Sequence, residues 1–169
     1  VEGEALFLRA LTYFDLVKFF GGVPLRTVGV TNYGADLDIA RSSADDIYAQ
    51  VISDLTDAYA KLPVSNGEFA DRYAAQALLA RVYLQQGNFA SALAAANDVL
   101  QNSGHSLAST FRGAFNNDSD SSEDIFAFQV TSQDGSNVLI SHYADQPYGG
   151  RGGDIVVDTY RTLFDSSLD

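Results

Sequence analysis

The chain has 169 residues and an apolar fraction of 46%, which is enough for one domain with a single buried core. Its formal net charge of −12 repels phosphate backbones and anionic lipid surfaces, so we expect no nucleic-acid partner. The absence of cysteine excludes disulfides, thiolate nucleophiles and Cys-ligated metals.

Two further absences concern the chain as a whole. It contains no Met, so we expect it to be a piece of a longer translation product. No apolar run approaches the roughly 18 residues that a membrane span requires. We therefore expect any membrane attachment to lie outside the chain.

The first twenty residues predict an amphipathic helix that is buried on two sides. Its two apolar stripes are Leu6, Ala10, Tyr13, Val17 and Phe20, and Phe7, Leu11 and Phe14. Gly21, Gly22 and Pro24 predict its end, because glycine accepts a left-handed cap and proline cannot continue the helical hydrogen bonds. We expect residues 25–42 to form an ordered loop.

A second helix is predicted to start at Ser43, which stands three residues before Asp46 at the spacing of a capping box. Pro63 ends it. Its predicted inward residues are Ile47, Val51, Leu55, Ala58, Tyr59 and Leu62.

Two more helices are predicted before Gly104, one from about Asp71 to Gly87 and one after it, as a tight antiparallel hairpin. The inward residues of the third helix are Ala75, Leu78, Leu79, Val82 and Tyr83. Those of the fourth are Phe89, Leu93, Ala96 and Leu100.

The character of the chain changes after Gly104. Residues 116–124 are polar and acidic, and residues 126–130 alternate as a half-buried strand does. Asp154 can cap a last helix whose inward residues are Val157, Tyr160, Leu163 and Phe164. We expect a helical-repeat region at 1–104, and a region of loops and a short strand with a final helix at 105–169, in one domain.

The spacing of small residues in the third and fourth helices is typical of a tetratricopeptide repeat. Ala80 precedes Tyr83, Gly87 lies at the turn, and Ala92 and Ala96 follow on the second helix. Because one hairpin leaves apolar faces open, we expect the first two helices to form a companion pair. The predicted fold is mainly α, with tetratricopeptide-like hairpins in an α-α superhelix and its closest helix contact at Ala80 and Ala96.

Four motifs resemble, in order, the SusD/RagB family of glycan-binding lipoproteins of Gram-negative outer membranes. They are GEALFLRALTYFDLVKFFGGVPL (3–25), RSSADDIYAQVISDLTDAYAKLP (41–63), RYAAQALLARVYLQQGNFASALAAANDVL (72–100) and EDIFAFQV (123–130). The resemblance covers nearly all of the chain, which is similar to the middle of such a protein.

The resemblance implies a non-catalytic protein that binds an oligosaccharide at the outer-membrane surface and delivers it to a SusC-like TonB-dependent transporter. Family members are similar in having a signal peptide in the precursor and a lipid-modified N-terminal Cys. The implied protein is a surface-exposed lipoprotein, and its lipid anchor lies outside this chain. We expect no cofactor.

Two tyrosines, Tyr143 and Tyr148, lie in a polar, Gly-bounded stretch and have no periodic reason to be buried. An exposed ring offers a flat apolar face to a sugar. Asn137, Gln146 and Arg151 can supply the planar groups that bond hydroxyls. The resemblance implies that this stretch forms part of the binding face, so we predict a glycan site at these five residues.

A calcium site is an alternative use of the acidic loop. Asp118, Asp120 and Ser122 follow the alternate spacing of a calcium loop, but Glu123 stands where its sixth-position Gly is expected. A solvated acidic loop is the simpler interpretation. Because the histidines also lack partners at ligand spacing, we predict no metal centre.

Two other classes of function stay open. A general tetratricopeptide scaffold would bind a protein on its concave face. A glycoside hydrolase would need two carboxylates about 5 to 10 Å apart in a cleft. Nothing in the spacing suggests such a pair, so we predict that the protein is not an enzyme.

Overall fold

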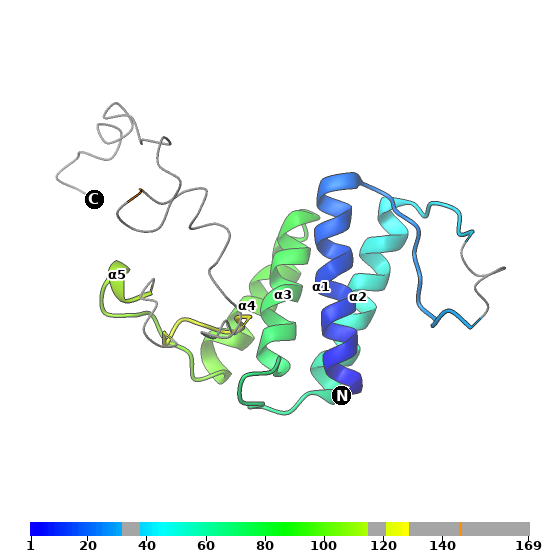
Figure 1. Cartoon of the computed structure of the whole chain (residues 1–169). Helices are drawn as coiled ribbons and strands as arrows, with labels where there is room; N and C mark the ends of the chain where they lie inside the picture. The colour runs from blue at the N-terminus through cyan, green and yellow to red at the C-terminus, as the bar shows by residue number, and fades with distance from the viewer. Residues whose placement is uncertain (32–37, 115–120, 129–145, 147–169) are drawn as a thin grey trace. The chain divides into compact units, whose positions relative to one another are not determined.

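Five helices form the regular structure of the described residues, which are 1–31, 38–114, 121–128 and 146 of the computed structural model (Figure 1). They are α1 (Glu2–Phe20), α2 (Ala44–Lys61), α3 (Arg72–Gln85), α4 (Phe89–Asn102) and α5 (Phe111–Ala114). The chain divides into two compact units, Val1–Ala127 and Phe128–Asp169, and all five helices belong to the first. The division of the sequence after residue 104 stays a prediction.

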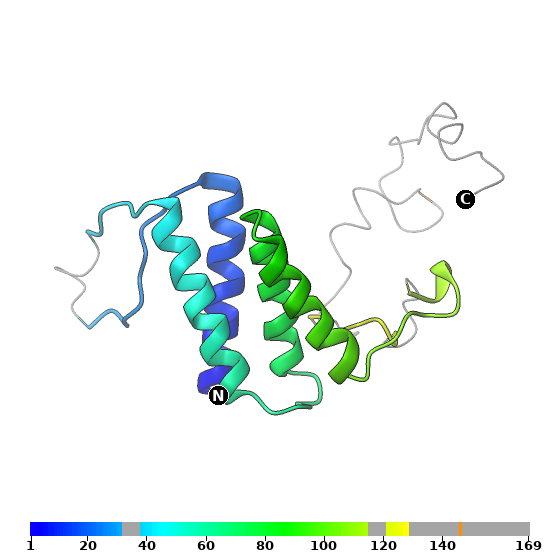
Figure 2. The same cartoon turned by 180° about the vertical axis from the view of Figure 1, so that it is seen from behind.

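The four long helices pack in two antiparallel pairs. α1 lies along α2, and α3 lies along α4, as both views show (Figures 1 and 2). α3 also packs against α2, so the second pair rests on the first. These contacts confirm the predicted hairpins and companion pair, and with them the mainly α fold. None of the described helices combines the length and the hydrophobicity that crossing a membrane requires.

Local side-chain chemistry sets the ends of α1 and α2. The Ser43 hydroxyl accepts a hydrogen bond from the Asp46 amide at 3.1 Å, and the Asp46 carboxylate accepts one from the Ser43 amide at 3.3 Å, which confirms the capping box. α1 ends at Gly21, whose φ of 67° is the left-handed geometry that glycine accepts. Gly22 follows, and the Ser42 carbonyl oxygen lies where the Cβ atom of any other residue would be.

The loop between α1 and α2 is held against α1. The Arg41 guanidinium donates to the Phe20 carbonyl at 2.6 Å. The Tyr13 hydroxyl accepts a hydrogen bond from the Arg26 amide at 2.7 Å. The described parts of the loop are therefore tied to the end and the middle of α1.

A buried ion pair joins α1 to α2. Asp54 is 2% exposed, and its carboxylate accepts hydrogen bonds from Arg9 Nε at 2.7 Å and Nη2 at 2.6 Å. Gln50 donates to the same carboxylate at 2.7 Å, and Arg9 Nη1 donates to the Thr27 carbonyl of the loop at 3.0 Å. The bond to Asp54 raises the pKa of the Arg9 guanidinium above its ordinary value, so Arg9 stays charged.

The inward face of α4 differs from the prediction. Its buried residues are Ala92, Ala95 and Val99. The large side chains predicted to face the core are exposed instead: Phe89 is 68% exposed, Leu93 63% and Leu100 73%. Small side chains let two helices approach closely, so the alanine stripe packs on α3 and the larger stripe turns outward. Ala80 and Ala96, the predicted closest contact, are only half-buried.

Two other expectations change or go untested. Phe20 is exposed at the end of α1 rather than inward. The described part of the predicted strand, residues 126–128, is not a strand, and no strand among the described residues is available to pair with it. The predicted final helix after Asp154 lies outside the described residues.

Replacing Asp54 by Ala should lower the free energy of unfolding by about 3 kcal/mol, because Arg9 would keep its charge in the α1–α2 interface without its bidentate partner. The Arg9 side chain is 28% exposed, so we expect a loss of stability at the low end of the range for removing one partner of a buried ion pair. Denaturant unfolding followed by circular dichroism measures the change. Asp57→Ala, at an exposed position of α2, should change the value by less than about 0.5 kcal/mol. Equal midpoints for the two variants would contradict the role of the pair.

Candidate functional site

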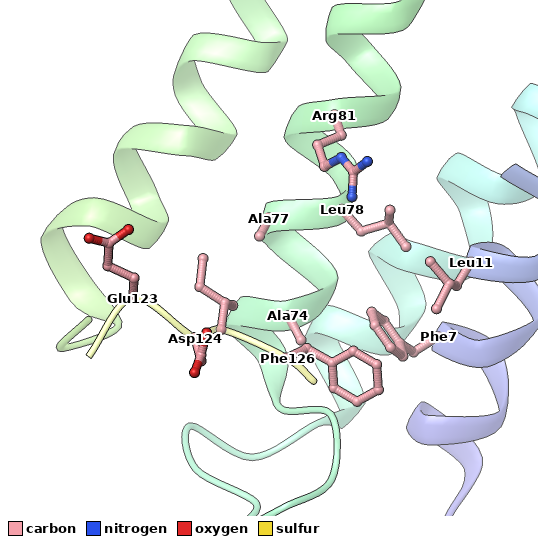
Figure 3. A pocket seen from close by; sticks show the side chains of 10 residues that line it. Phe7, Leu11, Ala74, Ala77, Leu78, Arg81, Glu123, Asp124 and Phe126 are labelled. Atoms are coloured by element: carbon pink, nitrogen blue, oxygen red, sulfur yellow. The ribbon is translucent and has the colours of Figure 1, made fainter. Parts of the chain in front are cut away.

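A pocket of about 310 Å³ lies between α1, α3 and the segment 121–127 (Figure 3). All three parts belong to the first compact unit. Ten residues line the pocket: Phe7, Leu11, Ala74, Ala77, Leu78, Arg81, Glu123, Asp124, Ile125 and Phe126. Its volume is within the range of small-ligand sites, and its lining is apolar apart from three charged side chains.

Two aromatic rings form the floor of the pocket. Phe7 of α1 and Phe126 of the segment meet edge to face, with ring centroids 4.9 Å apart and an interplanar angle of 75°. Phe7 is buried in the helical core, whereas Phe126 is half-buried. Phe126 therefore presents part of its ring to the pocket while its contact with Phe7 holds it in place (Figure 3).

Three charged side chains stand around this apolar floor. Arg81 projects from α3, and Glu123 and Asp124 extend from the segment 121–127 (Figure 3). The Glu123 carboxylate accepts a hydrogen bond from the Ala108 amide at 2.7 Å through Oε1. The Asp124 carboxylate accepts one from the Ser121 amide at 2.7 Å through Oδ2. Each carboxylate thus uses one oxygen in the fold and has a second oxygen for other donors.

One turn within the segment and one hydrogen bond to the chain after α4 hold the segment in place. The Ser106 amide donates to the Ser122 carbonyl at 3.0 Å, and the Asp124 amide donates to the Ser121 carbonyl at 3.0 Å. Serine and aspartate favour such turns because their side chains bond nearby backbone amides. The Ser/Asp-rich sequence before Ile125 therefore fixes where the carboxylates and Phe126 stand.

A second apolar hollow, of about 340 Å³, lies between α3 and α4, and we call it the α3–α4 groove. It is lined by Ala80, Arg81, Leu84, Phe89, Ala92, Leu93 and Ala96. Leu84, Phe89 and Leu93 are all exposed. A contiguous apolar surface of this kind is typical of a contact site for another macromolecule.

Most of the residues predicted for the glycan site lie outside the described residues: Asn137, Tyr143, Tyr148 and Arg151. Gln146 is described and is exposed, in the second compact unit. The calcium alternative, Asp118 and Asp120, also lies outside the described residues. Within the described part of the chain, no three His, Asp or Glu side chains gather as metal ligands do.

The pocket itself was not predicted from the sequence. The apolar pattern of the helix that carries Arg81 identified its inward-facing residues but gave Arg81 no role. No local pattern indicates that residues 123–126 pack beside this helix. The available signal was the pairing of charged Glu123 and Asp124 with apolar Ile125 and Phe126 directly after them. That pattern indicates a segment with one face on the core, but not the place on the core where it lies.

Several known proteins that are similar to this chain are SusD-like. The SusD-like family described as "Starch-binding associating with outer membrane" matches residues 1–84. SusD-like protein P2 of Formosa agariphila is 33% identical over 106 residues, which are 60% of this chain and 21% of that protein. The solved structure of a SusD-like carbohydrate-binding protein from Bacteroides fragilis is 27% identical, with a TM-score of 0.75. The match covers 88% of this chain and 30% of the chain in that structure. This chain belongs to the SusD-like family.

The SusD-like chain spans only part of its relatives. A solved laminarin-binding SusD-like protein, 30% identical with a TM-score of 0.59, covers 63% of this chain, and the match is 25% of that protein. The chain therefore spans about a quarter of the length of such relatives. The match to residues 1–84 includes all of α1 and α2 and nearly all of α3, so it includes the helices that carry Phe7 and Arg81.

Replacing Phe126 by Ala should lower the free energy of unfolding by about 2 kcal/mol, because the variant loses a half-buried ring and its edge-to-face contact with Phe7. Thermal and denaturant unfolding measure this loss. The matched control is Phe69→Ala, which removes an exposed ring and should cost less than about 0.5 kcal/mol. If the two variants were equally stable, Phe126 would not anchor the segment to the core.

Proposed function

We propose that this SusD-like protein binds an oligosaccharide without cleaving it. The observation that carries the proposal is the match of α1 to α3 to a family described as starch-binding. Two solved relatives support it, one described as carbohydrate-binding and one as laminarin-binding. The chemistry of the pocket is consistent with the same function.

The pocket offers the two kinds of contact that sugars need. The half-buried ring of Phe126, held against Phe7, provides an apolar surface for the C–H face of a pyranose. The Arg81 guanidinium donates hydrogen bonds, and Glu123 and Asp124 accept them from hydroxyl groups. Sugar hydroxyls both donate and accept, so a rim with both functions can hold a sugar ring in one orientation.

The five residues predicted from the sequence remain part of this proposal. Tyr143 and Tyr148 would stack on sugar rings, and Asn137, Gln146 and Arg151 would bond their hydroxyls.

We also propose where the protein acts and with which partner. The family is described as associating with the outer membrane. A surface-exposed lipoprotein at that membrane, held by an anchor outside this chain, would pass its glycan to a SusC-like TonB-dependent transporter. Such a protein needs no catalytic pair and no cofactor, because the transporter takes up the ligand intact.

A second candidate function is a tetratricopeptide scaffold that binds a protein. The specific observation in its favour is the α3–α4 groove, with Leu84, Phe89 and Leu93 exposed along it. Apolar side chains at helical spacing on two adjacent helices fit the apolar stripe of a helix from a partner. The two functions are compatible, since the groove and the pocket have only Arg81 in common.

Incubation of the full-length protein with neutral glucan, xylan and mannan oligosaccharides should show binding of at least one of them, with no shorter products between mild acid and neutral pH. Isothermal titration calorimetry measures binding, and chromatography of the sugars measures cleavage. Cleavage requires a positioned acid and base. Sustained release of shorter sugars that stops in Glu123→Gln or Asp124→Asn would replace the binding function with a hydrolase.

The same calorimetry tests the predicted tyrosines. Tyr148→Ala should weaken binding of the cognate glycan by about 1–2 kcal/mol, because a stacked ring contributes a large share of such affinities. Tyr83→Ala is the control, since Tyr83 packs against the helical core and should lower stability instead of affinity. Equal affinities of wild type and Tyr148→Ala would remove Tyr148 from the site.

If the α3–α4 groove binds a protein partner, the SusC-like transporter is the first partner to test. Leu93→Asp should then reduce co-purification of the protein with its co-expressed transporter at least about tenfold. The reason is that a carboxylate would lose its hydration in the apolar groove. Val64→Asp, at another exposed apolar position, should leave co-purification unchanged. Binding of a peptide in the groove without binding of any glycan or transporter would favour the scaffold over the glycan-binding function.

A further inference from the structure

The charged groups around the pocket bear on the kind of sugar that it accepts. The pocket wall holds one guanidinium, that of Arg81, and two carboxylates, those of Glu123 and Asp124. Two negative charges and one positive charge leave an excess of one negative charge beside the bound ligand. The chain as a whole carries a formal net charge of −12, which adds to the same field.

Hydrogen bonds to backbone amides hold the two carboxylates in place at the pocket. Glu123 is held by the Ala108 amide and Asp124 by the Ser121 amide, both at 2.7 Å. Within the described structure neither carboxylate forms an ion pair, and Arg81 is not paired with either of them. Arg81 and the two carboxylates therefore line one pocket without pairing, so a ligand that fills the pocket meets charges of both signs.

From this arrangement we propose that the pocket selects neutral oligosaccharides and discriminates against sugars that carry carboxylate or sulfate groups. The inference rests on the proposed glycan-binding function and specifies its substrate class. Hydroxyl groups can donate to Glu123 and Asp124 and accept from Arg81, so a neutral sugar satisfies all three. A carboxylate or sulfate accepts from Arg81 alone and is repelled by the other two.

The expected size of the discrimination follows from Coulomb's law. One excess charge at a few ångströms in a partly solvated pocket changes the affinity for a singly charged ligand about tenfold at low ionic strength. Added salt screens this repulsion, because at about 1 M the Debye length is only about 3 Å. Binding of a neutral sugar has no such dependence on salt.

Matched ligands isolate the effect of charge. The probes are glucan, mannan and galactan hexasaccharides and the same hexasaccharides with one C6 hydroxymethyl group oxidised to a carboxylate. Calorimetry with the full-length protein measures each pair at low and high salt. We expect at least one neutral hexasaccharide to bind, its oxidised form to bind about tenfold more weakly, and the difference to shrink to less than about threefold in high salt.

Variants locate the selectivity in the pocket. Asp124→Asn should reduce the tenfold difference between the neutral and the oxidised sugar, and Arg81→Gln should increase it, because they remove opposite charges from the same pocket. Asp57→Asn removes the same charge from an exposed position of α2 and should leave the difference unchanged. Asp124 is exposed, so its amide variant is expected to fold even if Glu123→Gln, which alters the bond to Ala108, does not.

The outcomes separate this inference from the function on which it rests. If neutral hexasaccharides bind and their oxidised forms bind equally or more tightly, the proposed charge selectivity is wrong, but the proposed glycan binding is supported. An equal effect of Asp124→Asn and Asp57→Asn would also overturn it, because the field would then belong to the whole protein. If no hexasaccharide of either kind binds, both the proposed function and the inference fail.

Discussion

The bidentate pair between Arg9 and Asp54 is the interaction on which the described structure depends. It fastens α1 to α2 inside their interface, and through the Thr27 carbonyl it also fastens the loop that joins them. The second helical pair rests on this first pair through the contact of α3 with α2. The place of Phe7 on α1, and so the floor of the pocket, follows from that fixed platform.

Helix α4 shows how one helix can serve the fold and the surface at once. Its alanine stripe allows close approach to α3, and its larger stripe is left facing outward, where it forms one wall of the α3–α4 groove. Exposing Phe89 and Leu93 forgoes the hydrophobic stabilisation that their burial would contribute, roughly 2 kcal/mol for each side chain. Exposed apolar area on this scale is typical of a surface that another polypeptide covers.

The pocket combines residues that are far apart in the sequence. Phe7, Arg81 and Phe126 come from the start, the middle and the later part of the first compact unit. Each is placed by a different local device: the core stripe of α1, the register of α3, and the Ser/Asp turns before Ile125. A site assembled in this way supplies apolar and polar contacts from separate walls, which suits a ligand such as a sugar that has both kinds of surface.

The sequence alone determined the four long helices and their ends, because caps such as Ser43 with Asp46 and stops such as Gly21 act within a few residues. The family followed from the order of the motifs. Only the tertiary structure decided which stripe of α4 is buried, since both stripes are apolar and periodicity cannot rank them. It also decided that Asp54 is buried, because its partner Arg9 lies on another helix. The pocket had no local signal, since packing between helices and a distant segment brings Arg81 and Phe126 together.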